Sequence, residues 1–420
     1  MKITILTYGS RGDIQPFLAL AVGLQKAGHI PTLAGPARFK ELASQYQVAY
    51  ATLAGDPAEI SVRINEAGSN PVRMVRAIRE YVFAIAPQVT RDARQALDGA
   101  DFVIHSFLFT TGGHTFAREL GIPDLSVQTF PMFASTRSFP NVAMSSIPPG
   151  SFSYLSHWLA AQIFWYGGNT GQPRFSKDYP QDFPAKLYWP FKQVNERPLT
   201  PLVFAYSPSV LPRPADWVAE NIHIPGYFFL EEADYKPAED LARFLENGEP
   251  PVCISFGSML HREAERIENA VCESLERTGQ RGLVLTGWGG EWRRKTSIDI
   301  FTQESAPHDW LLPRCKAVIH HGGAGTTAAG LRAGIPNIVI PFAVDQPFWG
   351  KRVEKLGVGP RPIPVKRISP SALSGAILIA VRDSSMQARA ARLGEKIRSE
   401  LGVSETIRLI EQTEAKFRRP

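Results

Sequence analysis

Cysteine is scarce in this sequence, with three residues among 420. Cys253, Cys272 and Cys315 are far apart and follow no metal-ligand spacing, so a disulfide scaffold and a cysteine-based zinc site are both excluded. A small and odd number of cysteines is typical of reduced thiols, and it predicts a cytoplasmic protein.

Long apolar runs are also absent. No stretch of roughly 20 apolar residues occurs, which predicts that no segment spans a bilayer. The apolar run at the N-terminus is too short for a signal peptide. The net charge is +6 and the pI about 9.2, but the basic residues are scattered. This pattern argues against nucleic acid as a partner and fits an anionic substrate or a membrane surface.

Three nucleotide and metal motifs are missing. The glycine-rich turn at residues 320–325 is not closed by the Lys-Ser or Lys-Thr pair of a nucleoside-triphosphate loop. No GxGxxG is followed by an acidic ribose ligand, which disfavours a dehydrogenase. No Asp-x-Asp pair is present to hold a divalent ion. We therefore expect neither a metal nor a cofactor.

The most informative stretch is KAVIHHGGAGTTAAGLRAGIPNIVIPFAVDQP, residues 316–347. It predicts a buried strand over 317–319, a glycine-rich turn, a helix over 326–333 and a second strand over 337–340. The glycines let backbone N–H groups approach a ligand, and the helix start adds free amides and a positive dipole end. The turn is therefore a candidate anion site. A tight turn without a ligand would need neither the two histidines nor the Thr pair.

HHGGAGTT, LRAGIP and PFAVDQPFWG resemble the donor-binding segment of the family-1 nucleotide-sugar glycosyltransferases, most closely the sterol and antibiotic glucosyltransferase branch. The opening GSRGDIQP resembles the acceptor-side loop of the same family. The resemblance is clear over residues 1–30 and 250–365, extends through 400 and is weak over 40–200. It implies the GT-B architecture, in which two Rossmann-like domains face a cleft.

The order of predicted elements agrees with an α/β fold of that kind, because both halves begin with a strand, a glycine loop, a helix and a strand. We expect an acceptor-binding domain over 1–207, a proline-marked linker over 208–225 and a nucleotide-sugar-binding domain over 226–395. The resemblance implies that a helix over 396–420 packs back on the first domain. Inside the first domain the sequence predicts a helix over 71–97, a loop at Gly112-Gly113 and a strand over 124–128.

Glycosyl transfer requires stabilisation of a diphosphate leaving group, and the glycine turn supplies the candidates. They are His321, Gly323, Gly325, Thr326 and Ser258, to which Ser10 and Gly12 of the opening loop are added on the donor side. The resemblance implies that His321 is the phosphate-binding histidine. His320 matches a non-ligand position, and we interpret it as a residue that ends a strand.

Other residues are candidates for binding the sugar and the nucleoside of the donor. Asp345 and Gln346 follow a strand end, where α/β proteins bind ligands, and the resemblance implies that they hold the hexose; Asp345 could instead be a cap before Pro347. Pro307 and His308 match the segment whose backbone binds uracil in relatives. Plant relatives carry a ribose-binding Glu eight residues after the phosphate histidine, but Ala329 stands there in this chain.

Asp13 is the candidate catalytic base, because it follows the loop after the first strand and the sterol and antibiotic branch has Asp at this position. It also precedes a predicted helix and could be its N-cap, and the two roles can coexist. His105 and His114 could approach an acceptor, but a single histidine after a strand is more often structural.

Aromatic residues are dense between 130 and 166, and Phe130, Phe133 and Trp158 are the candidate acceptor contacts. The segment 151–167 places apolar residues at helical spacing, among them Phe152, Leu155, Trp158 and Ile163. One interpretation is a helix that faces the core. The other is a pocket wall or an element at a membrane interface, which suits Trp and Tyr.

The sequence and the resemblance together predict an inverting, metal-independent glycosyltransferase. It would move a hexose from UDP-sugar, its co-substrate, to a hydroxyl of a lipophilic acceptor such as a sterol, a terpenoid or a macrocyclic natural product, with peripheral membrane contact. Three alternatives remain: a lipid-intermediate glycosyltransferase, a nucleotide-sugar epimerase on the same fold, and a non-catalytic protein that binds UDP-sugar or lipid.

Overall fold

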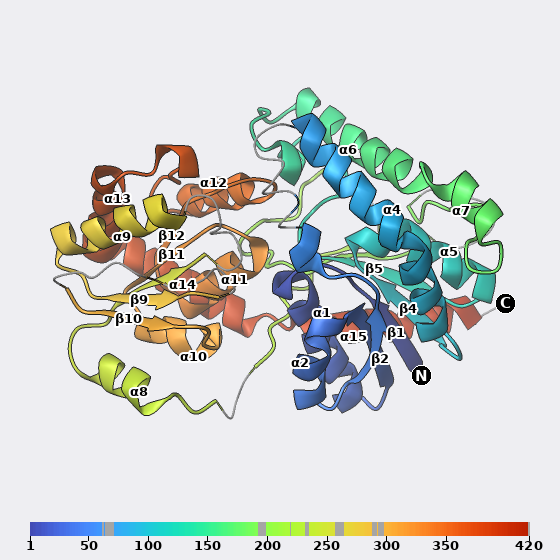
Figure 1. Cartoon of the computed structure of the whole chain (residues 1–420), viewed down its shortest axis with the longest axis horizontal. Helices are drawn as coiled ribbons and strands as arrows, with labels where there is room; N and C mark the ends of the chain where they lie inside the picture. Colours follow the sequence, from blue (N-terminus) through green and yellow to red (C-terminus); the bar gives the residue numbers. More distant parts are fainter. Residues whose placement is uncertain are drawn as a thin grey trace.

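The computed structural model describes residues 1–60, 63, 71–191, 199–218, 220–231, 235–256, 264–287, 292 and 298–418. These residues form two α/β domains, each built on a parallel sheet (Figure 1). The α/β class expected from the sequence is therefore confirmed.

The first sheet has seven strands in the order β3-β2-β1-β4-β5-β6-β7. They are β1 (Lys2–Leu6), β2 (Ile30–Pro36), β3 (Ala49–Leu53), β4 (Phe102–His105), β5 (Asp124–Gln128), β6 (Leu202–Phe204) and β7 (Ile222–His223). The central strands are continuous buried runs, as parallel strands covered on both faces must be. The strand order reverses between β1 and β4, so the carboxyl end of β1 is the switch point at which such sheets bind ligands.

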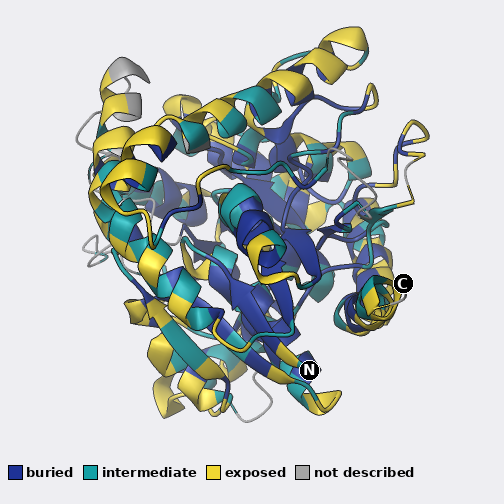
Figure 2. Cartoon of the chain, turned by 90° about the vertical axis from the view of Figure 1, so that its right-hand side faces the viewer, coloured by how far each residue is buried: buried dark blue, intermediate teal, exposed yellow. Residues whose placement is uncertain are grey.

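Helices cover both faces of this sheet. They are α1 (Arg11–Lys26), α2 (Lys40–Gln45), α4 (Pro71–Ala96), α5 (Thr110–Leu120), α6 (Ser151–Asn169) and α7 (Gln172–Asp178). Ile5 packs in the core under α1 and α2, whereas its neighbour Leu6 packs in the core under α4 and α5. Successive strand residues point to opposite faces, so this alternation separates the two layers. Figure 2 shows the buried strands behind helices whose outer faces are exposed.

The second sheet repeats the arrangement with five strands in the order β10-β9-β8-β11-β12. They are β8 (Val252–Ser255), β9 (Gly282–Leu285), β10 (Ile300–Gln303), β11 (Ala317–His320) and β12 (Asn337–Val339). The helices of this domain include α8 (Glu239–Glu246), α9 (Ala264–Thr278), α10 (His308–Leu311), α11 (Ala324–Ala333), α12 (Gln346–Leu356) and α13 (Pro370–Arg382). The order reverses between β8 and β11. The carboxyl ends of these two strands therefore form the second switch point.

Apolar contacts join the two domains. Phe348 of α12 lies 5.6 Å from Phe139 of the first domain, and Trp349 lies 6.2 Å from Tyr206, measured between ring centroids. The C-terminus crosses back: α14 (Ser384–Ser399) belongs to the second domain, and α15 (Gly402–Arg418) packs against α1 (Figure 1). His29 at the end of α1 contacts Glu411 of α15 at 3.2 Å.

Two expectations from the sequence need correction. Gly112 and Gly113 lie inside α5, which begins at Thr110, and do not form a loop. A Cβ at Gly113 would lie 2.6 Å from Cβ of His105, so the glycine permits close packing of α5 on β4. The segment 208–225, expected to be a linker, contains β7, which pairs with β6 at the edge of the first sheet.

Among the described helices, we find none that is both long and apolar enough to cross a bilayer. Cys253, Cys272 and Cys315 are buried and form no disulfide.

Candidate active site

The N-termini of α1 and α11 meet at the boundary between the domains. A Cβ added to Gly325 would lie 3.8 Å from Cα of Gly12, so the two backbones approach closely. Each helix follows a strand at the switch point of its own sheet, and each directs the positive end of its dipole toward this boundary. The structure thus brings the opening loop and the glycine turn together, although more than 300 residues separate them in the chain.

His321 lies against the glycine turn. A Cβ at Gly323 would lie 2.5 Å from Nε2 of His321, and a Cβ at Gly322 would lie 2.6 Å from Val339. Gly322, which has a positive φ of 90°, therefore needs glycine, whereas a side chain at Gly323 would displace the His321 ring. Gly323 is the N-cap of α11, which starts at Ala324, two residues earlier than expected. Thr326 lies in the first turn, partly exposed.

His308 and Ser255 lie beside His321. Nε2 of His308 is 3.5 Å from Oγ of Ser255. Burial, together with the positive charge of Arg11, lowers the pKa of His308 to about 4. Burial likewise lowers the pKa of His321 to about 4, against the opposing effect of the Ser255 backbone. Both imidazoles are therefore neutral near pH 7, and the guanidinium of Arg11 lies near His308.

His320 is a structural residue, in agreement with the sequence interpretation. Its side chain is fully buried, and its Nε2 is 3.0 Å from Oδ1 of Asn337. Nδ1 accepts a hydrogen bond of 3.1 Å from the backbone N–H of Gly322. Both ring nitrogens are engaged within the protein, so His320 fixes the glycine turn and has none left for a ligand.

Asp13 is the third residue of α1, whose N-cap is Ser10, so the expectation that Asp13 itself could be the N-cap is wrong. Its carboxylate accepts from the backbone N–H of Ser10 at 2.8 Å and from the Ser10 hydroxyl at 2.9 Å. Burial raises the pKa of Asp13, and these two hydrogen bonds oppose the shift. A Cβ at Gly9 would lie 2.3 Å from the carboxylate, which explains the glycine there.

Asp345 faces Asp13 from the second domain. It is the N-cap residue of α12, and its carboxylate accepts from Nε1 of Trp349 at 3.1 Å. Burial raises the pKa of Asp345 to about 6, and the negative charge of Asp13 contributes to the rise. One carboxylate from each domain therefore lies at the boundary, close enough for the charge of Asp13 to oppose the ionisation of Asp345.

The loop before Asp345 is strained. Val344 has a φ of 57°, a left-handed conformation that is unusual for a β-branched residue, and its side chain is exposed. Gln346 is buried, and its Oε1 accepts from the backbone N–H groups of Phe342 at 2.8 Å and Ala343 at 3.3 Å. The carbonyl end of Gln346 thus holds this loop, which was not expected from the sequence.

The remaining predicted donor residues are placed as follows. Pro307 is the buried residue before α10, and His308 is the first residue of that helix. Ala329 packs in an apolar cluster with Trp310 and offers no polar group to a ribose. Ser258 lies outside the described residues.

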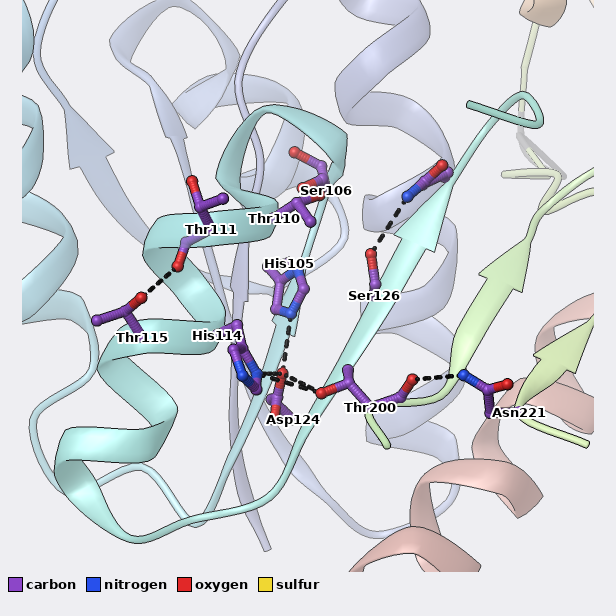
Figure 3. Close-up of polar contacts among 11 residues, drawn as sticks. His105, Ser106, Thr110, Thr111, His114, Thr115, Asp124, Ser126, Thr200 and Asn221 are labelled. Carbon is purple, nitrogen blue, oxygen red and sulfur yellow. Dashed lines mark hydrogen bonds and ion pairs between the residues drawn. The ribbon is translucent and has the colours of Figure 1, made fainter. Parts of the chain in front are cut away.

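His105 and His114 belong to a buried polar cluster inside the first domain (Figure 3). Nε2 of His105 and Nδ1 of His114 lie 3.0 and 2.9 Å from the same oxygen of Asp124, and the Thr200 hydroxyl donates to that oxygen at 3.1 Å. The hydrogen bonds from these histidines hold the pKa of Asp124 well below its usual range despite burial. The cluster joins α5 to β4 and β5, which supports the structural interpretation of both histidines.

Two of the three candidate acceptor residues lie in an aromatic cluster. It contains Phe107, Phe130, Phe133, Phe164, Trp189 and Phe191. The centroids of rings in contact with each other are 5.1 to 6.1 Å apart. Trp158 does not point into this cluster. It is about half exposed on the outer face of α6, so the structure separates it from Phe130 and Phe133.

Sequence reasoning missed Ser255, Arg11 and Trp349. Ser255 ends β8 at the switch point, and Arg11 stands in the opening motif beside Asp13. The positions of Ser255 and Arg11 in the predicted elements could therefore have indicated that both lie at the site. Trp349 had only its spacing of four residues from Asp345, which places both on one side of a helix.

Comparison with known proteins agrees with this organisation. Residues 3–136 match the glycosyltransferase family 28 N-terminal domain, and residues 298–412 match the erythromycin biosynthesis protein CIII-like C-terminal domain. The chain is 35% identical to the O-mycaminosyltylonolide 6-deoxyallosyltransferase of Streptomyces fradiae, over 98% of this chain and 97% of that protein.

Sterol 3-beta-glucosyltransferases are similar as well. The chain is 33% identical to UGT80A2 of Arabidopsis thaliana, over 97% of this chain, and 33% identical to the enzyme of Candida albicans, again over 97%. It spans 65% of the plant protein and 27% of the fungal one.

Solved structures share the fold. The glycosyltransferase of kitacinnamycin superposes with a TM-score of 0.72 at 18% identity, covering 98% of this chain and 99% of the other. The calicheamicin glycosyltransferase CalG4 gives 0.71 at 17% identity, covering 100% and 99%. SsfS6 of Streptomyces sp. SF2575, solved in complex with thymidine diphosphate, gives 0.62 at 18% identity, covering 98% and 99%.

The buried charge of Asp345 should cost stability. Folding raises the pKa of this carboxyl, so its protonated form stabilises the folded state at any pH below the pKa that it has in the unfolded chain. This stabilisation is lost as the pH rises through about 6, the pKa in the folded state. Asp345→Asn stays neutral, so at pH 7.5 it should raise the free energy of unfolding by about 1–2 kcal/mol, a value discounted for partial exposure. At pH 4 the gain should vanish. Thermal unfolding across this pH range checks it, with exposed Asp98→Asn as the control; a pH-independent gain would contradict the assignment.

Proposed function

This chain belongs to the glycosyltransferase family of the sterol glucosyltransferases and macrolide glycosyltransferases, and from that premise we propose that it transfers glucose from UDP-glucose to a hydroxyl of a lipophilic acceptor. The acceptor class is a sterol, a terpenoid or a macrocyclic natural product. The observation that carries the proposal is the meeting of Asp13 from one domain with His321 and Asp345 from the other at two helix N-termini.

The leaving group is held by the second domain. The positive end of α11 lies where a diphosphate would approach the glycine turn, and His321 adds a neutral donor. Arg11 brings a positive charge near the same place from the first domain. These groups together offset the charge that develops on the departing diphosphate, so the proposed mechanism uses no metal.

Asp13 acts as the general base in this mechanism. The acceptor oxygen attacks the anomeric carbon while Asp13 takes the hydroxyl proton. The bond from the anomeric carbon to the diphosphate oxygen breaks, and the electron pair leaves with the nucleoside diphosphate. A single displacement of this kind inverts the anomeric configuration. Burial raises the pKa of Asp13, which makes it a stronger base than an exposed carboxylate while it remains hydrogen-bonded to Ser10.

Asp345 suits the hexose. An ionised carboxylate accepts hydrogen bonds from sugar hydroxyls, and its position at the start of α12, opposite Asp13, would place the sugar between donor turn and base. The aromatic cluster around Phe133 supports an apolar acceptor, because six rings gathered near one another form a surface suited to a steroid or a macrolide.

A thymidine diphosphate sugar is the second candidate donor. Two observations favour it: the Streptomyces fradiae relative is named a deoxyallosyltransferase, and SsfS6 was solved with thymidine diphosphate. Ala329 also removes the carboxylate that plant relatives carry for the ribose. The nucleotide is therefore the part of the proposal that needs the most direct test.

A matrix of donors and acceptors tests the proposed function. UDP-glucose, UDP-galactose and thymidine diphosphate glucose are each incubated with sterols, macrolides, small phenols and no acceptor, and products are identified by mass spectrometry. We expect glucosylated sterol or macrolide from UDP-glucose. Donor conversion without an acceptor would identify an epimerase, and nucleotide binding without turnover would identify a non-catalytic protein.

Replacement of the base separates chemistry from binding. Asp13→Asn keeps the oxygen that accepts from Ser10 but cannot take a proton, so kcat should fall by roughly 100-fold or more. Affinity for UDP, measured by calorimetry, should stay within about twofold, because the diphosphate binds to the other domain. Asp13→Glu restores a carboxylate and should recover part of the rate. A kcat near that of the wild type in Asp13→Asn would reject the assignment.

The donor turn is tested through His321. Loss of one hydrogen bond to a charged phosphate should weaken binding of UDP and UDP-glucose alike, by roughly 10- to 100-fold in His321→Ala. His29→Ala, which removes a contact with Glu411 of α15, is the control.

Turnover should also survive EDTA. If chelation stops turnover and magnesium restores it, the metal-free mechanism is wrong.

A further inference from the structure

The helix α6 has an unusual composition for the surface of a water-soluble domain. None of its 19 residues is Asp, Glu, Lys or Arg. Seven large apolar or aromatic side chains are between 42 and 70% exposed: Phe152, Tyr154, Leu155, Trp158, Leu159, Ile163 and Tyr166. The expectation that this stripe faces the core is therefore wrong. We refer to these seven residues as the α6 face.

Over residues 151–160, the side of α6 that faces the protein is made of small and polar residues. Ser153, Ser156, His157 and Ala160 are at most 5% exposed. Small and polar residues thus occupy the positions that apolar residues fill in an ordinary surface helix, and large apolar residues occupy the positions that charges usually fill. Contiguous exposed apolar patches of this kind mark interaction surfaces.

Hydrogen bonds hold α6 in this orientation. Ser153 donates to the carbonyl of Pro148 at 3.1 Å, the Ser156 hydroxyl accepts from the backbone N–H of Asn141 at 2.9 Å, and Nε2 of His157 is 3.0 Å from the carbonyl of Phe139. Rotation of the helix to bury the apolar face would break all three and leave buried polar groups without partners. The α6 face therefore remains outward in the folded protein.

The charge around the α6 face favours an anionic partner. Phe83 of α4 lies 5.4 Å from Phe175 of α7, and α7 follows α6 directly, so the three helices form one outer layer (Figure 1). Together they carry seven Lys or Arg and three Asp or Glu, a net charge of +4 out of +6 for the whole chain. The exposed basic residues are Arg73, Arg76, Arg79, Arg91, Arg174 and Lys177.

We propose that the α6 face docks on an anionic lipid membrane. An uncharged helix with Trp and Tyr at its surface, flanked by exposed arginines, has the features of an element that lies in the plane of a bilayer interface. The hydrogen bonds of its inner side tie it to the domain, so it would enter the headgroup region without leaving the fold. A second copy of this chain would bring the same net positive layer against itself, which disfavours a dimer through this face.

The same helix connects the α6 face with the aromatic cluster. Phe164 of α6 lies 5.1 Å from Phe133 and 5.8 Å from Phe107, measured between ring centroids. Docking would therefore place the aromatic cluster next to the membrane, which is where an apolar acceptor partitions. This second step, in which the acceptor is taken from the membrane, rests on the proposed function; the docking surface itself does not.

Vesicle sedimentation tests the docking surface. The full chain is mixed with vesicles of phosphatidylcholine, with or without phosphatidylglycerol, and the bound fraction is measured after centrifugation. We expect binding to the anionic vesicles, and a loss of affinity of about tenfold or more in the triple variant Phe152→Ser, Leu155→Ser, Ile163→Ser. The matched control is Ile30→Ser, Val218→Ser, Leu401→Ser, which also removes three exposed apolar side chains and should bind as the wild type does.

Several outcomes would overturn the proposal. Wild-type protein that stays in the supernatant with every vesicle rejects it, and so does an α6 variant that binds as well as the wild type. Sedimentation velocity provides a further test, because a wild-type dimer that the α6 variant converts to a monomer would show that a second copy covers the face. Circular dichroism and the melting temperature establish that both triple variants are folded.

An activity measurement separates this proposal from the proposed function. The α6 variant should keep wild-type turnover on an acceptor dissolved in water and lose it selectively on the same acceptor embedded in anionic vesicles. If no acceptor is turned over by either protein while vesicle binding follows the expected pattern, the proposed function fails and the docking surface stands.

Discussion

The close approach of two helix N-termini is the constraint on which the candidate site depends. Gly12 of α1 and Gly325 of α11 lie close to each other across the domain boundary, and each helix begins at the switch point of its own sheet. Helix N-termini attract anions, and the side chains near this meeting include two buried carboxylates, Asp13 and Asp345, where the charge of Asp13 opposes the ionisation of Asp345. The site therefore combines a place that favours negative charge with two acids that are held there at a cost in stability. Such a conflict is typical of functional sites.

The division of these groups between the domains has a mechanistic consequence. His321, His308 and Asp345 belong to the second domain, whereas Asp13 and Arg11 belong to the first. The apolar contacts Phe139–Phe348 and Tyr206–Trp349, together with α15 on α1, fix the two domains against each other. Trp349 also donates to Asp345, so one residue contributes both to the domain contact and to the position of the Asp345 carboxylate. The position of Asp13 relative to the glycine turn is thus set by packing outside the candidate site.

Much of the fold could be predicted because its signals are local. The helix expected over 71–97 is α4 (Pro71–Ala96), and the strand expected over 124–128 is β5. The start of α5 could not be predicted, since Gly112-Gly113 indicates a loop unless one knows that His105 packs against Gly113. The site shows the same division: His321, Asp345 and Asp13 stand in motifs, whereas the partnership of Asp124 with His105 and His114 joins residues from two strands and a helix. Contacts between separate elements leave no periodic pattern in the sequence.

The helix α6 shows why periodicity alone cannot decide which way a helix faces. Its apolar residues recur at helical spacing, and that spacing is the same whether the stripe points inward or outward. The deciding information lies in the other residues: Ser153, Ser156 and His157 have partners at Pro148, Asn141 and Phe139, and these partners precede the helix in the chain. A buried polar group without a partner costs more than an exposed apolar side chain, so the polar side goes inward and the apolar side is left outward. An apolar stripe opposite a side of Ser and His, with no charge in the helix, is therefore the sequence pattern that indicates an outward-facing apolar surface.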